Sequence, residues 1–199
     1  MTLEEIRKEM EKDFAILVRK MDYVAHDLSK TLSKSDKEKG FERYYDYCSK
    51  YKNNWIYRVF ITKKKIEFEY MMLYHNGKGH AAIGMSEDLA IIYHTGHFFE
   101  RYNERCNLGL KTINEIIRAY MKENNEYDIK ELEEIEPGIF KIFSIVQSGI
   151  MLGMHNKNLN LFKANTYIPN HMLSKNQSEM KQMFLDEIEK YRFTSDLLN

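Results

Sequence analysis

The chain has 199 residues, of which 43% are hydrophobic and 13% aromatic, a composition that excludes general disorder. Lys and Arg together number 30, as do Asp and Glu, so the formal net charge is zero and no global field attracts nucleic acid. Any nucleic-acid binding must therefore come from a local patch, and a net charge near zero favours self-association.

The two cysteines, Cys48 and Cys106, lie far apart in the sequence and form no CxxC motif. They predict reduced thiols in an intracellular protein. The amino terminus lacks the apolar core of a signal peptide, and no apolar run approaches the roughly 20 residues that span a bilayer. The sequence therefore predicts a cytoplasmic protein with no membrane partner.

Residues 2–31 are predicted to form a helix that begins with a capping box of Thr2 and Glu5. The pattern predicts burial against a core of the same chain, with a partner helix in a homodimer as the alternative. The apolar residues behind this prediction recur at spacings of three and four: Leu3, Ile6, Met10, Phe14, Leu17, Val18, Met21, Val24 and Leu28.

A polar break at residues 33–40 precedes a second predicted helix, which Ser35 or Asp36 caps and which ends near Asn53. This segment is rich in tyrosine and carries interleaved basic residues. Its rings could stack on RNA bases, or they could pack with their hydroxyl groups at the surface. The sequence leaves both interpretations open.

From Trp55 onward the hydrophobic period changes to two, which predicts a sheet built from hairpins. Three consecutive lysines form the first turn, and we interpret them as a solvated hairpin rather than a phosphate contact. The predicted order is strand 55–62, turn 63–65, strand 66–74, turn 76–79, strand 80–85 and strand 88–93.

Two short helices are predicted next. Thr95 is a candidate N-cap for a helix over residues 96–106, which the chain enters directly from a strand. Thr112 can cap the second helix, over residues 113–121, which has one apolar face. The acidic segment 123–136 follows and is predicted to be exposed or to shield a basic surface.

A second β block and a final helix complete the chain. Strands are predicted at residues 139–146, 150–154 and 159–168, and an amphipathic helix at residues 176–192. The predicted fold class is therefore α+β: an antiparallel sheet with amino-terminal helices, a central His/Arg helix pair and a carboxy-terminal helix.

Two domain divisions fit this order of elements. Residues 1–54 would be an amino-terminal helical region and residues 55–199 an α+β core domain. The alternative is one continuous domain over residues 1–199.

The strongest functional signal is a stripe on the predicted helix 96–106. His97, Arg101 and Arg105 are four residues apart and therefore share one helical face. The two arginines are like charges at i,i+4, an arrangement that costs an isolated helix roughly 0.2–0.5 kcal/mol. Glu104 can pair with Arg101, which leaves Arg105 without a partner on its helix. The pattern predicts an anion site in which a histidine can exchange protons.

An alternative explains the same stripe without a ligand. Arginines on surface helices commonly pair with carboxylates from other elements, and the segment 123–136 could supply them. The stripe would then be a salt-bridge network in a structural or protein-interaction module.

Further residues can extend the site. His94 immediately precedes the helix, and Lys163 and Tyr167 share a strand face if strict alternation holds, so these three are candidates for substrate binding. His75 and His80 flank a turn, and His94 and His97 are three residues apart. Together these histidines could present imidazoles to a metal ion. No full ligand set with a carboxylate or thiolate is visible, so the sequence predicts no metal and no cofactor.

The spacing His-x-x-x-Arg-x-x-x-Arg, just after a strand and before a glycine and a second helix, resembles DUF4258-type domains, which are often grouped with RelE-like toxin ribonucleases. The run from residue 138 to residue 153 resembles the sheet that follows in such domains, and the resemblance covers about residues 88–170. The chain is also similar to uncharacterised bacterial and phage-type proteins.

Three functional hypotheses follow. The resemblance implies a toxin-like, metal-independent endoribonuclease in which His97 moves protons while Arg101 and Arg105 stabilise the phosphorane charge. A second hypothesis is a noncatalytic module that binds RNA or another phosphate-bearing ligand with the same basic face, or a protein partner. The third is the structural salt-bridge network. The sequence alone leaves open whether the protein is an enzyme.

Overall fold

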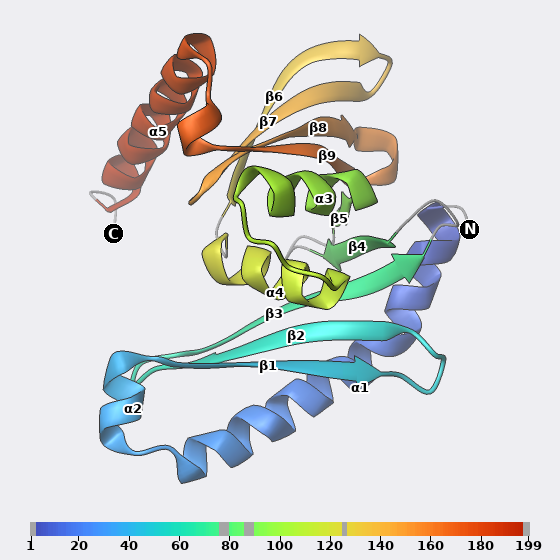
Figure 1. The fold of residues 1–199 in the computed structure, drawn as a ribbon, viewed down its shortest axis with the longest axis vertical. Helices are drawn as coiled ribbons and strands as arrows, with labels where there is room; N and C mark the ends of the chain where they lie inside the picture. The colour runs from blue at the N-terminus through green and yellow to red at the C-terminus, as the bar shows by residue number, and fades with distance from the viewer. Residues whose placement is uncertain (1–2, 76–79, 86–89, 125–126, 197–199) are drawn as a thin grey trace.

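The computed structural model of the chain describes residues 3–75, 80–85, 90–124 and 127–196 (Figure 1). Its α+β architecture confirms the predicted fold class. One nine-stranded sheet has the order β1-β2-β3-β4-β5-β9-β8-β7-β6. The strands are β1 (Phe41–Cys48), β2 (Asn54–Ile61), β3 (Ile66–His75), β4 (His80–Met85), β5 (Ile91–His94), β6 (Tyr127–Glu136), β7 (Ile139–Val146), β8 (Gly149–Asn156) and β9 (Leu161–Pro169).

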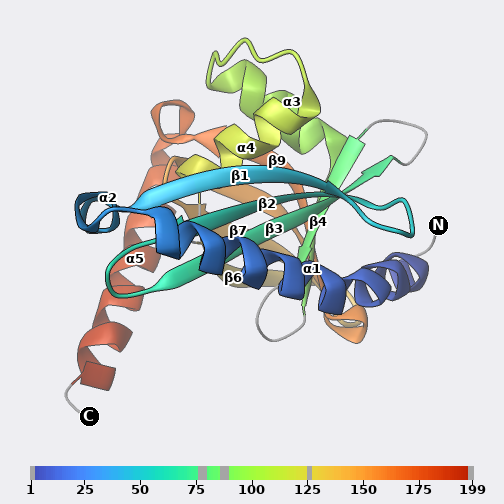
Figure 2. The same cartoon turned by 90° about the horizontal axis from the view of Figure 1, so that it is seen from below.

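Helices cover both faces of this sheet (Figures 1 and 2). α3 and α4 pack on one face, where the two halves of the sheet meet, and α1 packs on the opposite face against β2 and β3. α5 covers the same face as α1, over β7 and β8. The helices are α1 (Leu3–Thr31), α2 (Lys34–Lys39), α3 (Gly96–Arg105), α4 (Ile113–Glu123) and α5 (Lys175–Asp196), with 3-10 turns η1 (Lys157–Leu159) and η2 (Asn170–Met172).

The sheet consists of two antiparallel meanders joined by one parallel pair. β1 to β5 form the first meander and β6 to β9 the second. β5 and β9 run parallel, with His94 opposite Ala164. The predicted sheet was wholly antiparallel. The parallel pair arises because the chain leaves β5 through α3 and α4 and completes β6 to β8 before it returns beside β5.

The amino-terminal helix buries its apolar stripe against the sheet of its own chain. Ile6, Met10, Leu17 and Met21 are each at most 2% exposed and pack with residues of β2 and β3. Burial of such side chains contributes about 1.5–3 kcal/mol each, which explains why this long helix lies along the sheet. The predicted helix and its buried face are confirmed, while Thr2 lies outside the described residues.

The segment predicted as a tyrosine-rich helix is a strand, β1. All eight of its residues are in register with β2, and Tyr45 stacks on Tyr57 with ring centroids 5.1 Å apart. Tyrosine and phenylalanine favour strands, and the cross-strand partners offered by β2 outweigh the helix-like spacing of these rings. The preceding short helix, α2, is capped by Ser33, with Asp36 completing a capping box, rather than by Ser35.

The acidic segment after α4 is also a strand. β6 lies at the edge of the sheet and pairs with β7 through an irregular register, with shifts near Glu134. Its carboxylates and its bulges suit an edge strand, because both discourage pairing with another chain. The predicted exposure of this segment is confirmed for most of the strand. Its extended conformation was not predicted, because glutamate is uncommon in strands.

Other predicted elements match the structure closely. The three-lysine turn joins β2 to β3, and α5 extends slightly beyond the predicted range of 176–192 at both ends. The predicted turn at 76–79 and the start of the strand 88–93 lie outside the described residues. The division at residue 54 stays a prediction, although β1, before it, is hydrogen-bonded to β2, after it. Within the described part of the chain, no helix has the length and apolarity needed to cross a bilayer.

Candidate functional site

The start of α3 is fixed by a cap and by close packing. Thr95 Oγ1 accepts a hydrogen bond from the Phe98 amide across 3.2 Å, which confirms the predicted N-cap. Gly96 lies so close to β4 that a Cβ atom there would stand 2.9 Å from the His80 carbonyl oxygen. The helix therefore begins at a set position against β4, and its rotation about its own axis is fixed from the first turn.

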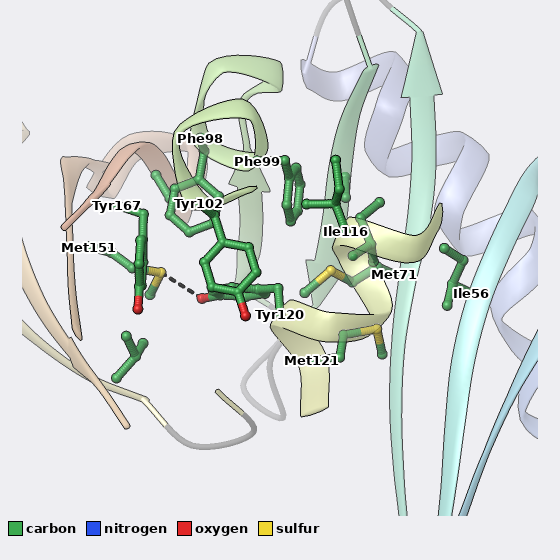
Figure 3. Close-up of a cluster of buried hydrophobic side chains, with 14 residues drawn as sticks. Ile56, Met71, Phe98, Phe99, Tyr102, Ile116, Tyr120, Met121, Met151 and Tyr167 are labelled. Atoms are coloured by element: carbon green, nitrogen blue, oxygen red, sulfur yellow. Dashed lines mark hydrogen bonds between the residues drawn. The ribbon is translucent and has the colours of Figure 1, made fainter. Parts of the chain in front are cut away.

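The inner face of α3 is aromatic and fully buried. Phe98, Phe99 and Tyr102 are 0% exposed and meet Tyr120 of α4 edge to face, with centroid distances of 5.2–5.9 Å (Figure 3). Tyr102 and Tyr167 of β9 meet in the same way at 5.0 Å. Edge-to-face pairs contribute about 0.5–1.5 kcal/mol each beyond their buried area. This packing orients the opposite face of α3 outward.

His97 lies on the outer face and is solvated. Its side chain is 83% exposed, and its Nδ1 atom lies 2.8 Å from Glu100 Oε2. A carboxylate at this distance can orient the imidazole ring. The predicted proton-exchanging residue is thus accessible and has a carboxylate partner one helical turn away.

The two arginines of the stripe lean toward β9 rather than toward glutamates. Arg101 Nη1 donates to Thr166 Oγ1 across 2.7 Å, instead of pairing with Glu104 as the spacing suggests. Arg105 Nη1 lies 3.5 Å from the same hydroxyl and donates to the backbone carbonyl of Tyr167. Among the described residues neither guanidinium forms an ion pair with a carboxylate. Both guanidinium groups therefore lack a carboxylate partner in the part of the chain that the structure describes.

A bulge in β9 sets these contacts. The register with β8 shifts between Leu152 and Gly153, so that Gly153 pairs with Ala164 and Leu152 with Thr166. A Cβ atom at Gly153 would lie 1.9 Å from the Lys163 carbonyl oxygen, so the close approach of the strands requires glycine there. Thr166, whose hydroxyl accepts the hydrogen bond from Arg101, lies immediately after this bulge.

The same bulge overturns the predicted pairing of Lys163 with Tyr167. Ala164 and Tyr167, three residues apart, both pack in the cluster under α3 and α4, whereas Leu161 packs in the α1 cluster. Strict alternation fails across the extra residue, so Lys163 lies on the face of Leu161 and opposite to Tyr167. The structure does not bring Lys163 to the arginines.

Tyr167 is near the arginines only through its backbone. Its side chain is 0% exposed, and its hydroxyl lies 2.7 Å from Ser148 Oγ. Burial raises the pKa of this phenol well above its ordinary value. A ligand at the surface of α3 would therefore lie near the backbone carbonyl of Tyr167 and would not reach its phenol.

His94 is separated from His97 by burial. It is 3% exposed and packs against the rings of Phe98, Phe99 and Tyr120. Burial lowers the pKa of this imidazole to about 4, so it is neutral at pH 7. The predicted site therefore divides: His97, Arg101 and Arg105 lie together on the surface, and His94 lies inside.

The sequence did not identify Thr166, the residue whose hydroxyl both arginines approach. A single threonine near a strand end carries no pattern of its own, and its role depends on the bulge. Among the residues that the structure describes, no three His, Cys, Asp or Glu side chains are grouped so that they could bind a metal ion. The rings of His75 and His80 contact each other edge to face, with centroids 4.8 Å apart.

Comparison of the chain with protein-family models, with curated proteins and with solved structures found no match. The resemblance to DUF4258-type and RelE-like domains therefore stays a prediction, and function must be argued from this chain's own residues.

Proposed function

We propose that the protein binds a phosphate-bearing polyanion, with RNA as the ligand class, through Arg101 and Arg105 on the outer face of α3. The observation that carries this proposal is the pairing of both guanidinium groups with neutral acceptors, the Thr166 hydroxyl and the Tyr167 carbonyl. These acceptors orient the groups and leave their charge available. A phosphate oxygen is a natural additional acceptor for each.

Two other arginines, Arg58 and Arg118, show the contrast. Arg118 forms a salt bridge with Asp46, and the buried Arg58 lies near the carboxylates of Glu42 and Glu69. Their charge is compensated by the protein. For Arg101, the alternative of a salt-bridge network lacks a carboxylate partner in the described residues, which favours an external anion.

The electrostatics favour contacts with the phosphate backbone of RNA rather than recognition of its bases. The chain has zero formal net charge, so the attraction is local to α3 and must weaken as salt is added. Two arginines that converge on one hydroxyl are spaced for one or two adjacent phosphate groups. Such contacts position a strand without specifying its sequence.

A metal-independent cleavage activity is a second candidate, favoured by the His97–Glu100 contact. His97 lies one turn before Arg101, and its carboxylate partner is placed to orient a general base. In such a reaction the imidazole removes the proton of a 2′-hydroxyl, whose oxygen attacks the adjacent phosphorus while an arginine stabilises the phosphorane charge. The P–O5′ bond then breaks, and the 5′-oxygen takes a proton from the imidazolium as it leaves. The 83% exposure of His97 favours binding over catalysis, since active sites are usually concave.

One experiment separates these outcomes. Wild-type protein is titrated into a fluorescently labelled, mixed-sequence single-stranded RNA in EDTA at several salt concentrations, and the RNA is then examined for cleavage and end groups. Binding that weakens with salt and leaves the RNA intact supports the proposal. Products with 2′,3′-cyclic phosphate that disappear in folded His97→Ala establish the second candidate. Absence of binding at low salt contradicts both.

A further inference from the structure

A pocket with a volume of about 120 Å³ lies beneath α4, between the two halves of the sheet. Its apolar lining includes Met71 of β3, Ile92 of β5 and Met151 of β8. His94, Glu69 and Tyr120 supply polar atoms to the same wall. Pockets that are mostly apolar with a few placed polar groups are the usual form of small-molecule sites.

His94 is a polar pocket residue that has a buried ring nitrogen without a hydrogen-bond partner in the described part of the chain. The ring is held by its contacts with three aromatic side chains. Its Nδ1 atom is buried and has no hydrogen-bond partner among the residues that the structure describes. In the neutral tautomer that carries its proton on Nε2, Nδ1 is an acceptor that lacks a donor.

Two further polar groups of the pocket have oxygen atoms that can accept a hydrogen bond. Glu69 Oε2 is buried and has no hydrogen-bond partner, although Arg58 Nε lies 3.3 Å from it. The Tyr120 hydroxyl donates its proton to Met151 Sδ across 2.9 Å, which leaves its oxygen lone pairs available (Figure 3). A buried acceptor without a donor costs about 1–3 kcal/mol, so a ligand that supplies a donor is favoured there.

We propose that this pocket binds a small, neutral, single-ring molecule whose O–H or N–H group donates a hydrogen bond to His94 Nδ1. The ring would lie among Met71, Ile92 and Met151, and the donor would point toward β5. This site is independent of the arginine surface of α3, and it would operate whether or not the protein binds RNA.

The size of the pocket supports a ring rather than an isolated water. An engineered apolar cavity of roughly 150 Å³ binds benzene, whereas a water needs only about 10–15 Å³ of comparable space. One water could satisfy His94 Nδ1, but it would leave most of the apolar lining without contacts. A ring with a donor satisfies both requirements at once.

The test uses phenol and benzene as probes of matched size. Each is titrated into the wild-type protein, and binding is followed by amide chemical shifts in two-dimensional NMR spectra. We expect saturable phenol binding at least about tenfold tighter than benzene binding, because only phenol gives Nδ1 a donor. Equal affinities, or no saturable binding of phenol, would overturn the proposal without bearing on RNA binding.

A variant comparison locates the probe. His94→Phe retains a ring of similar size but removes Nδ1, so phenol binding should weaken about tenfold and approach that of benzene. The matched control is His155→Phe, which replaces a second buried histidine, stacked on Phe162 outside the pocket. Phenol affinity unchanged in His94→Phe would contradict the proposal. If that variant does not fold, the comparison of the two probes in wild type decides the question.

Discussion

Arg101 donates a hydrogen bond to the hydroxyl of Thr166 across 2.7 Å, and this contact joins α3 to β9 without neutralising the guanidinium. Arg105 approaches the same hydroxyl at 3.5 Å. Thr166 therefore gathers two like charges that would otherwise move apart. The protein bears the cost of their repulsion at a surface position, where a polyanion would offset it.

Removal of the Thr166 hydroxyl should lower both the stability of the protein and its affinity for RNA. Thr166→Val retains the branched side chain that suits a strand but removes the acceptor, so unfolding free energy should fall by about 1 kcal/mol. RNA affinity should also fall severalfold, since the guanidinium groups lose their fixed orientation. Urea unfolding and RNA anisotropy measure the two effects. The control is Thr31→Val, whose hydroxyl bonds to carbonyls of α1. Lowered stability with wild-type RNA affinity would show that Thr166 only fastens α3.

Loss of the Tyr167 hydroxyl should affect stability alone. Tyr167→Phe removes its hydrogen bond with Ser148 and should lower the unfolding free energy by about 1 kcal/mol. The Ser148 hydroxyl keeps its bond to Asn124 Oδ1, so no buried group is left unsatisfied. RNA affinity should be unchanged, because the phenol is fully buried. A tenfold loss of RNA affinity at constant stability would instead show that the Tyr167 phenol takes part in RNA binding.

The buried Glu69 should make stability fall as pH rises. Burial raises its pKa from 4.5 to about 7, opposed by Arg58. Between these values the unfolded chain is ionised while the folded carboxyl holds its proton, so the folded state is penalised as pH increases. Relative to wild type, Glu69→Gln should therefore gain up to about 3 kcal/mol of stability between pH 4.5 and pH 7. Urea unfolding across this range measures the difference.

A second titrating group, His94, affects the same pH range. His94 has a pKa lowered to about 4, so its protonation in the unfolded state makes stability rise with pH over part of the same range. The wild-type curve contains both effects, and only the difference from Glu69→Gln isolates the carboxyl. Glu67→Gln, on the same strand but at a glutamate that pairs with Lys65, is the matched control. A pH-independent difference for Glu69→Gln would contradict the raised pKa.

The sequence predicts the parts of the fold that depend on local chemistry. The Thr95 cap, the Thr112 capping box and the apolar stripe of α1 follow from residue types at fixed spacings, and the structure has each of them. The grouping of Arg101 with Arg105 follows from helical periodicity in the same way. These features need no knowledge of how distant segments meet.

The remaining features depend on contacts between distant segments. β1 is a strand because β2 provides partners for its tyrosines, and β9 runs parallel to β5 because of the order in which the chain adds strands. The bulge that separates Lys163 from Tyr167 and presents Thr166 depends on the packing of Gly153. The inward position of His94 likewise depends on which face of β5 meets α4. No local pattern in the sequence encodes these outcomes.

RNA anisotropy with Arg101→Gln, compared with Arg118→Gln, tests the central claim most directly. Both changes remove one arginine, but Arg118 already has a carboxylate partner and Arg101 has a neutral one. We predict that at roughly 50 mM salt Arg101→Gln binds RNA about tenfold more weakly and that its log–log salt slope falls by about 1. Arg118→Gln should bind like wild type. Equal affinities for wild type and both variants would contradict an RNA-binding role for α3.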